Sequence, residues 1–448
     1  MLKKILISFL FISVGIQSQN TVSGILSSKN DLVARVILYQ LKGAKQVYIS
    51  NSKIDNNQFK MEIPKGTPSG MYRLSFNPGA VGYIDFLFSQ VDISLKFDPL
   101  NISSTLEFSN SEENKTYANY LNETASVKHK LDSLQIAFFG LKDKKQDEIT
   151  IDLFAETLNI YTKIQGEYEA KTEGKLVNHF IKSSRSYYAP VLFSSPQQYL
   201  NSVKQHYFDF TYFDNNDLKN SNFFSEKAIE YVLYLNVSDD VQVQNALYQN
   251  AIKEVMQKIG GNIEVKSEIL TSLIYAFEQF ENWTMTGFVL DNFYSKLPAT
   301  YKDEALIIEM KSKIKLGIGN KAPEIVWEEN GIQKKLGELT ASENYILVFW
   351  STTCSHCLQE IPKLYEFTNG NTKMHVVAVA LEDNKKDFEQ FATKLATWTN
   401  ILGLKKWENE MAKEYKINST PTYFILDKDK KIIAKPEHYE DVKAYFKN

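Results

Sequence analysis

The pattern of apolar and polar positions changes twice along this chain of 448 residues. From Thr21 to Phe108, short stretches alternate apolar and polar residues, and turn residues separate them. This period of two predicts β-strands, which we place at 33–39, 58–63, 71–76 and 91–97. We expect residues 21–108 to form an antiparallel β-sandwich. The region contains no cysteine, no histidine and no glycine-rich phosphate loop, so we interpret it as a docking or spacing module.

Residues 111–316 have the pattern of an α-helical domain. Apolar residues recur every three or four positions, as in 153–164 and 229–235, which is the spacing of one helix face. Aromatic residues are dense between 187 and 224, but basic residues are not interleaved with them, as binding of single-stranded nucleic acid requires. Core packing is therefore favoured over a platform for bases or carbohydrate. The histidines at 129, 179 and 206 lack the spacing of metal ligands.

Strand-like and helix-like segments alternate from Gly319 to the end of the chain. The pattern predicts a strand at 345–350, followed by a helix with an apolar face made by Leu358, Ile361, Leu364 and Phe367. After it we expect a strand at 374–380, helices at 385–397 and 407–415, a strand-turn-strand at 422–434 and a helix at 439–446. This order predicts that residues 319–448 form an α/β sheet with helices on both faces.

The N-terminus predicts export. A cationic start, Met1–Lys4, precedes an apolar stretch at 5–16 and a polar segment at 17–20, which is the order of a secretory signal peptide over residues 1–18. The alternative is an uncleaved anchor, but the stretch is shorter than the roughly 20 residues that span a bilayer. Cleavage after Ser18 or after Gly15 would fit, and no nearby cysteine offers a site for lipid attachment. We expect a protein of the Gram-negative periplasm, with no stable membrane span after cleavage.

Charge and cysteine content narrow the set of possible functions further. The net charge of −3 provides no overall basic field for nucleic acid. A chain of this length forms about three domains and buries a large core, so it does not need disulfides for stability. It nevertheless has two cysteines, Cys354 and Cys357, placed three positions apart. In an oxidising compartment such a pair is either a disulfide or a dithiol that is kept reduced.

The position of Cys354 predicts redox chemistry. It falls in the turn between the strand at 345–350 and the following helix, where free backbone N–H groups and the helix dipole lower a thiol pKa below about 8.5. Cys354 is then the nucleophile, and Cys357 attacks the resulting mixed disulfide and releases the partner. As a structural disulfide the pair would close a very small loop and stabilise little. A zinc site would need further ligands, so we expect no metal and no cofactor.

Several short motifs in this region together resemble one family. They are Gly319, Ala322 and Pro323, Phe349-Trp350, Cys354-Ser355-His356-Cys357, Glu360-Ile361-Pro362, and Ser419-Thr420-Pro421-Thr422. Residues 319–448 thereby resemble the thioredoxin-fold proteins of the TlpA/ResA type. These are periplasmic thiol:disulfide oxidoreductases, often linked to cytochrome c maturation. Their long Bacteroidete versions carry a β-rich N-terminal module and a helical middle, which this chain resembles more loosely.

The resemblance assigns roles to individual residues. Thr420 and Pro421 match the cis-proline loop beside the dithiol, where substrate binds, and Trp350 is expected to wall the site. Pro362 matches a proline that kinks the first helix. Glu360 matches an acidic residue kept near the cysteines, for proton transfer with the resolving thiol. Read alone, a glutamate in a first helical turn is usually solvated and stabilised by the dipole, so both readings of Glu360 stay open.

Two departures from the family and one dipeptide bear on the redox potential. Thr353 replaces the common tryptophan before the first cysteine, and Val348 replaces the buried acid of cytoplasmic thioredoxins. Ser355 and His356, between the cysteines, tune the potential, and a histidine there resembles strongly oxidising or isomerase motifs. Family resemblance favours a reductase, with an oxidant or isomerase as the alternative.

The sequence also bears on two other classes of function. A peroxiredoxin needs proline and threonine where this chain has Leu347 and Ser351, so a peroxidase is disfavoured. A binding protein is the alternative from another class, with a β-sandwich and aromatic-rich helices that recognise a partner and a C-terminal domain that is only regulatory. For the oxidoreductase, the expected partners are client proteins with thiols or disulfides and a membrane-bound electron donor or acceptor. The client, the role of residues 21–316 and the oligomeric state do not follow from the sequence.

Overall fold

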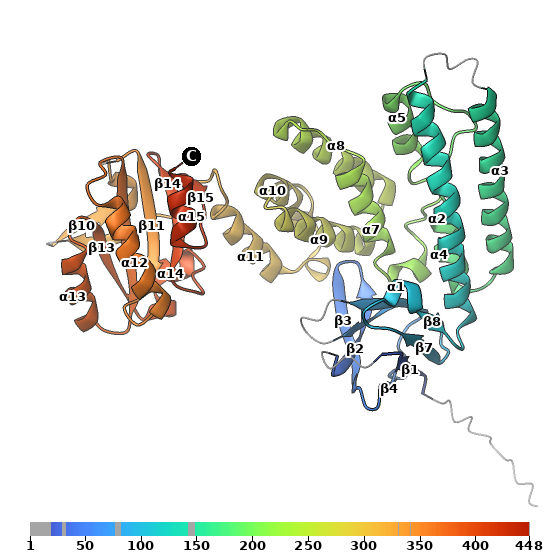
Figure 1. Ribbon diagram of the computed structural model, residues 1–448, viewed down its shortest axis with the longest axis horizontal. Coiled ribbons are helices and arrows are strands. Elements are labelled where there is room, and N and C mark those ends of the chain that lie inside the picture. The colour runs from blue at the N-terminus through green and yellow to red at the C-terminus, as the bar shows by residue number, and fades with distance from the viewer. Residues whose placement is uncertain are drawn as a thin grey trace, which may run out of the picture. The chain divides into compact units, whose positions relative to one another are not determined.

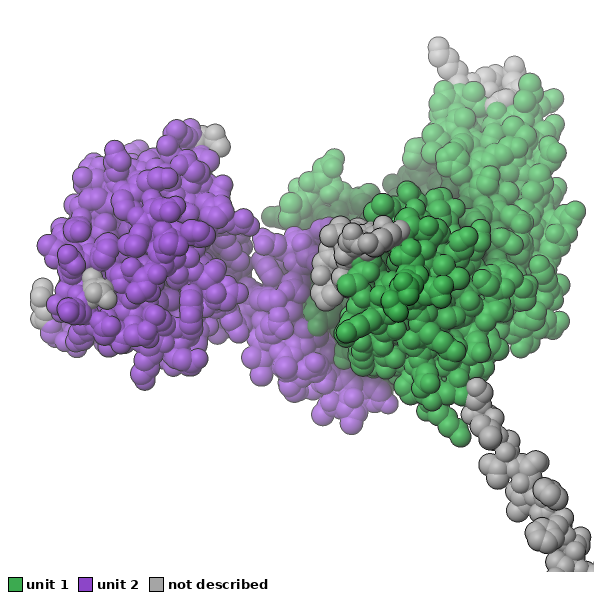
Figure 2. All heavy atoms as spheres, turned by 60° about the horizontal axis from the view of Figure 1, so that its bottom comes forward, with its two compact units in different colours: residues 1–276 green, residues 277–448 purple. Residues whose placement is uncertain are grey.

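The computed structural model describes residues 19–28, 33–76, 82–141, 148–329, 331–340 and 342–447. The signal peptide predicted at residues 1–18 lies outside them. The chain forms two compact units, residues 1–276 and residues 277–448 (Figure 2). Among the helices of the described residues, none is long and apolar enough to cross a membrane.

Two four-stranded sheets form the first part of unit 1. Their orders are β4-β1-β7-β8 and β3-β2-β5-β6. The strands are β1 (Thr21–Leu26), β2 (Arg35–Lys42), β3 (Lys45–Lys53), β4 (Gln58–Glu62), β5 (Gly70–Phe76), β6 (Tyr83–Phe88), β7 (Ile93–Phe97) and β8 (Glu107–Phe108), with helix α1 (Ile102–Thr105) before β8. Buried residues of both sheets, such as Leu74 of β5 and Leu95 of β7, belong to one apolar core.

The prediction that this module is antiparallel is wrong at one pair of strands. β1 and β7 run parallel, with Val22 opposite Ile93. Alternating polarity identifies a strand but carries no direction, and five other strands separate these two in the sequence. Strand β3 was not predicted, because nearly all of its residues are exposed or half-exposed on both faces and it therefore lacks a period of two.

Helices make up the rest of unit 1 (Figure 1). They are α2 (Glu112–Phe139), α3 (Glu148–Lys171), α4 (Leu176–Ser183), α5 (Pro196–His206), α6 (Asn216–Lys219), α7 (Phe223–Ile229), the π-helix η1 (Glu230–Tyr234), α8 (Val241–Ile259) and α9 (Ile263–Gln279), whose last turn extends into unit 2. The side chain of Ser111 accepts a hydrogen bond from the backbone N–H of Asn114 and so caps α2. This cap fixes the change from strand to helix at the residue where the sequence pattern changes.

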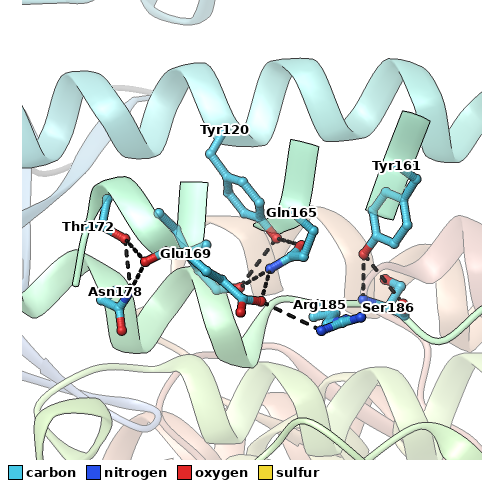
Figure 3. A network of polar contacts seen from close by, with 9 residues as sticks. Tyr120, Tyr161, Gln165, Glu169, Thr172, Asn178, Arg185 and Ser186 are labelled. Carbon is cyan, nitrogen blue, oxygen red and sulfur yellow. Dashed lines mark hydrogen bonds and ion pairs between the residues drawn. The ribbon is translucent and has the colours of Figure 1, made fainter. Parts of the chain in front are cut away.

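A buried polar network joins α2, α3 and α4 (Figure 3). The hydroxyl of Tyr120 on α2 donates to Gln165 Oε1 on α3 at 2.9 Å. Gln165 Nε2 in turn donates to Glu169 Oε1 at 2.8 Å and to the carbonyl of Ile181 on α4 at 3.2 Å. Arg185 Nη1 lies 3.9 Å from the same Glu169 oxygen. Such satisfied networks fix one arrangement of helices, since each group left unpaired would cost free energy.

The dense aromatic residues of this unit pack against one another. Phe208, Phe213, Phe223 and Phe224 are buried, and the rings of Phe213 and Phe224 lie 5.2 Å apart between centroids. The interpretation of these residues as core packing is confirmed for these four.

Unit 2 is built around a five-stranded sheet of order β13-β12-β11-β14-β15. Its strands are β11 (Asn344–Trp350), β12 (Met374–Glu382), β13 (Thr399–Leu404), β14 (Thr422–Asp427) and β15 (Ile432–Ala434). β12 is parallel to β11 and to β13, and β14 is antiparallel to β11. Ahead of the sheet come α10 (Trp283–Asn292), the 3-10 turns η2 (Tyr294–Lys296) and η3 (Ala299–Tyr301), α11 (Glu304–Lys315), the hairpin β9 (Val326–Glu329) and β10 (Ile332–Lys335), and η4 (Leu336–Glu338).

Helices cover both faces of this sheet, as predicted. Residues of the buried central strand β11 alternate between two cores, with Leu347 in one and Val348 in the other. The core around Val348 is closed by residues of α12 (Ser355–Thr368), α13 (Lys386–Lys394) and α15 (Tyr439–Tyr445). The other core is closed by α14 (Glu410–Glu414), which follows the 3-10 turn η5 (Lys406–Glu408).

The predictions for unit 2 differ from the structure in four respects. The predicted helix at 407–415 is a 3-10 turn followed by α14, and strand β13 was not predicted. Leu358, placed on the apolar face of α12, is exposed, whereas Ile361 and Leu364 are buried as expected. Helices α10 and α11, grouped with the middle domain in the sequence analysis, belong to the same compact unit as the sheet.

Candidate active site

Cys354 stands at the N-cap of α12, after the end of the central strand β11. Its φ of −93° and ψ of 117° are extended, and its Sγ accepts a hydrogen bond from the backbone N–H of Cys357 at 3.2 Å. The Cys354 thiol also lies 3.2 Å from the carbonyl oxygen of Thr420, to which it donates. The sulfur thus faces the unpaired N–H groups of a helix start and the loop ahead of β14.

The two thiols have opposite pKa shifts. Burial alone would raise the pKa of the Cys354 thiol, but hydrogen bonds outweigh it and lower the pKa below its usual value; they come from Cys357, Thr420 and the backbone N–H of His356. Cys357 is fully buried, and burial raises the pKa of its thiol to about 12. Cys354 therefore becomes a thiolate far more readily than Cys357, as the sequence analysis expected of a nucleophile and its resolving partner.

The residues next to Cys354 lie where the motifs placed them. The peptide bond between Thr420 and Pro421 is cis, as predicted, and both residues are half-buried beside the dithiol. Ser355 and His356 are exposed in the first turn of α12. The effect of His356 on the Cys354 pKa comes through its backbone N–H.

Glu360 is held in place by groups from two other elements. Its Oε2 accepts hydrogen bonds from the Tyr423 hydroxyl and from the backbone N–H of Tyr439, each at 2.9 Å. Its Oε1 lies 3.6 Å from Nδ1 of His438. With a side chain only 19% exposed, Glu360 is anchored by protein groups, which contradicts the alternative reading of a solvated carboxylate.

Tyr423 donates a hydrogen bond to this carboxylate and packs in the same apolar core as the dithiol. It is buried on β14, two positions after Pro421, and its pKa lies above the usual range because of burial first, then Glu360, then the two thiols. No motif in the sequence singles out Tyr423. Alternation could have found it, because residues 421, 423 and 425 point to the same face of the sheet.

A second carboxylate, Glu382, supports the turn that precedes Cys354. It ends β12, its residue is 3% exposed, and it accepts hydrogen bonds from the backbone N–H of Thr352 and from the Ser351 hydroxyl. Ser351 Oγ also accepts from the Thr353 N–H at 3.2 Å. Glu382 was missed because the predicted strand ended two residues earlier, at Ala380.

Trp350 lies in the core behind the cysteines, and Pro362 is exposed on α12. Trp350 is 1% exposed and packs in the same core as Cys354 and Cys357, so it supports the site from beneath and offers no face to a substrate. Pro362 lies inside α12, where it has no N–H for the helical ladder. Within the described residues, no group of three or more His, Cys, Asp or Glu could hold a metal ion.

Comparison with known proteins identifies the type of domain that contains this site. Residues 343–432 match the family described as Thioredoxin-like. The C-terminal part of the chain is therefore a thioredoxin-like domain, and the curated proteins that it is similar to include thiol-disulfide oxidoreductases.

These relatives share the name ResA. The chain is 26% identical to thiol-disulfide oxidoreductase ResA of Geobacillus thermodenitrificans over 142 residues, which cover 30% of this chain and 80% of the relative. It is 26% identical to ResA of Bacillus anthracis over 144 residues, with the same coverage of 30% and 80%.

Two solved structures are also similar. A domain of a possible thiol-disulfide isomerase from Cytophaga hutchinsonii is 32% identical, with a TM-score of 0.26, over 29% of this chain and 90% of that chain. A thioredoxin-like protein from Bacteroides caccae is 17% identical, with a TM-score of 0.38, over 59% of this chain and 97% of that chain.

Proposed function

We propose that this protein is an exported thiol:disulfide oxidoreductase that reduces disulfides of client proteins in the periplasm. The observation that carries the proposal is the difference between its two thiols. Cys354 at a helix start has a lowered pKa, and the buried Cys357 next to it has a pKa raised to about 12. A reactive outer thiolate and a protonated inner thiol are what stepwise exchange with a disulfide needs.

The exchange proceeds in two balanced steps. The Cys354 thiolate attacks one sulfur of the client disulfide, so that a mixed disulfide forms and the other client sulfur leaves as a thiolate. Cys357 then loses its proton and attacks Cys354 Sγ, which breaks the mixed disulfide and releases the second client thiolate. The client gains two electrons, and Cys354 and Cys357 are oxidised to a disulfide. A membrane-bound donor would return the pair to the dithiol.

Glu360 suits the proton transfer in the second step. Its carboxylate lies next to Tyr423, whose hydroxyl points at it and whose pKa responds to both thiols. We assign Glu360 to accept the Cys357 proton as the mixed disulfide resolves, with Tyr423 as the residue that positions it.

The direction of electron flow rests on His356. An imidazolium close to Cys354 would stabilise the thiolate and favour an oxidant. In this site the hydrogen bonds that lower the Cys354 pKa come from Cys357, Thr420 and backbone N–H groups, that of His356 among them, and the His356 side chain is exposed. This favours a reductase, and the resemblance to the TlpA/ResA type makes apocytochrome c a suitable client. The lowered pKa of Cys354 is the one observation in favour of an oxidant.

An insulin-reduction assay with dithiothreitol tests the activity. We expect turnover by the wild type and none by Cys354→Ser. Unchanged turnover in that variant would contradict the proposal. A wild type without turnover would contradict it as well and would favour the binding-protein alternative. The equilibrium potential against glutathione settles direction, since a value close to −120 mV would identify an oxidant and one close to −270 mV a reductase, on the usual scale of about that range.

A further inference from the structure

A groove of about 800 Å³ lies in unit 2, between the helices that precede the sheet and the segment that leads into the active-site loop. Trp283 of α10 and Lys313 of α11 line one side of it. Trp407 of η5, Lys416 and Asn418 line the other side. Neither the redox motifs nor the proposed chemistry uses this groove.

The groove begins close to the reactive sulfur. Asn418, one of its lining residues, stands two positions before Thr420, whose carbonyl oxygen is 3.2 Å from Cys354 Sγ. Two residues of extended chain span at most about 7 Å. A polypeptide whose sulfur is bonded to Cys354 therefore reaches the groove within a few residues.

The lining of the groove offers aromatic surface. Trp407 is 46% exposed and Trp283 is half-buried. Half-exposed indole rings next to an active site are suited to bind apolar or aromatic side chains, because covering them removes a large apolar area from water. Tryptophan is also among the residue types that most often dominate the binding energy of protein interfaces.

The lining also offers unpaired positive charge. Lys313 and Lys413 each form ion pairs with two glutamates. Among the described residues, Lys416 and Lys435 have no such partner within 4.0 Å. Burial lowers the pKa of Lys435, and Glu281 acts on it only at longer range. The Lys435 ammonium lies 5.8 Å from the centre of the Trp283 ring. A carboxylate entering the groove would relieve the cost of burying the Lys435 ammonium without an ion-pair partner, and the exposed Lys416 would attract it as well.

We propose that this groove binds a client segment that carries an aromatic side chain and a carboxylate within a few residues of the client's reacting cysteine. The inference rests on the proposed function and adds a substrate class to it. Glutamates at 278, 281 and 309 also line the groove, so a polyanion such as nucleic acid would meet repulsion along part of its length. A short polypeptide with one acidic side chain would not meet this repulsion along its length.

Two synthetic peptides test the proposal on the full reduced protein. Each is closed by one disulfide and has the same length; one has Trp and Glu after its second cysteine, and the other has Ser and Lys there. We expect the wild type to reduce the Trp/Glu peptide about tenfold faster, an advantage of the size of one charge-assisted contact with an aromatic anchor. The variants Trp407→Ala and Lys416→Glu should reduce this ratio to less than about twofold.

Two controls separate this inference from the proposed function. Lys428→Glu makes the same charge change on an exposed residue in the turn after β14, at the end of the strand away from the dithiol, and should keep the tenfold ratio. The small neutral disulfide bis(2-hydroxyethyl) disulfide has no aromatic ring and no carboxylate, so it reports on the dithiol alone and should react equally with all variants. Equal rates for both peptides with normal reduction of this small disulfide would overturn the inference only. No reaction of the wild type with any of these disulfides would overturn the proposed function and the inference with it.

Discussion

The difference between the two thiols predicts a large difference in their reactivity. Cys357 has a pKa of about 12, so its thiolate fraction at pH 7 is about 10⁻⁵, since each unit between pH and pKa is a factor of ten. Cys354 has a pKa below the usual 9.0, so its thiolate fraction at pH 7 exceeds about 10⁻². Alkylation requires the thiolate, and Cys354 should therefore react at least about a thousand times faster than Cys357.

The assay is alkylation of the reduced full-length protein with iodoacetamide at pH 7, followed by peptide mapping. The sign of the pH dependence follows from the lowered pKa: labelling of Cys354 rises with pH and reaches half of its maximum below pH 9, while labelling of Cys357 is still rising at pH 10. Unfolding in urea provides the control, because both thiols then have ordinary pKa values and should label at similar rates.

Two results would refute this reasoning. One is similar labelling of the two cysteines in the folded protein. The other is a Cys354→Ser variant that still takes up label at the wild-type rate, because the reactive thiolate would then be at position 357.

Three further predictions concern the groups around the dithiol. Tyr423→Phe keeps the buried ring but removes a hydrogen bond to the carboxylate of Glu360. The free energy of local opening, read from hydrogen exchange in β11 and β14, should fall by about 1–2 kcal/mol. In a Glu360→Gln background the same substitution should leave this free energy unchanged, which would show that the two side chains are coupled. Glu382→Ala leaves the Thr352 N–H and the Ser351 hydroxyl without their buried acceptor and should lower the same free energy by about 1–3 kcal/mol. As the control, Asp383→Ala removes an ion pair with Lys406 at the surface and should lower it by less than about 1 kcal/mol. Equal losses in the two variants would show that Glu382 does not hold the turn. His356→Ala keeps the backbone N–H that faces Cys354 and should change the equilibrium potential against glutathione by less than about 30 mV. A larger fall in the potential would show that the imidazole of His356 sets it.

The chemistry of the site could be read from the sequence because it depends on local order. A buried strand, a turn and an amphipathic helix follow one another between residues 344 and 368, and that order alone places Cys354 at a helix start. The cis bond before Pro421 was predicted from a motif and is confirmed. In each case neighbours in the chain decide the geometry.

The groups that support the site could not be read in the same way, because they come from distant parts of the chain. Tyr423 and Tyr439 meet Glu360 across 63 and 79 residues, and no local period records such a contact. The parallel pairing of β1 with β7 was missed for the same reason. Polarity patterns identify which face of an element is buried, but they do not identify which other element covers it.

Position 348 holds a valine where cytoplasmic thioredoxins have a buried acid. Val348 lies in the apolar core beneath α12, together with Trp350 and Cys357, so no carboxylate is available there to take a proton from the buried thiol. Two carboxylates stand at the edges of that core instead. Glu382 binds the turn ahead of Cys354, and Glu360 binds Tyr423 and the start of α15.

In the proposed mechanism, the two carboxylates divide the work that one buried acid would do. Glu382 has its hydrogen bonds with the turn at 351 and 352, so it fixes the approach to Cys354. Glu360 is 19% exposed, so it can exchange a proton with water without first opening the core. Under the proposed role of Glu360 as the acceptor of the Cys357 proton, the rate of resolution should depend on Glu360, while the reactivity of Cys354 should not.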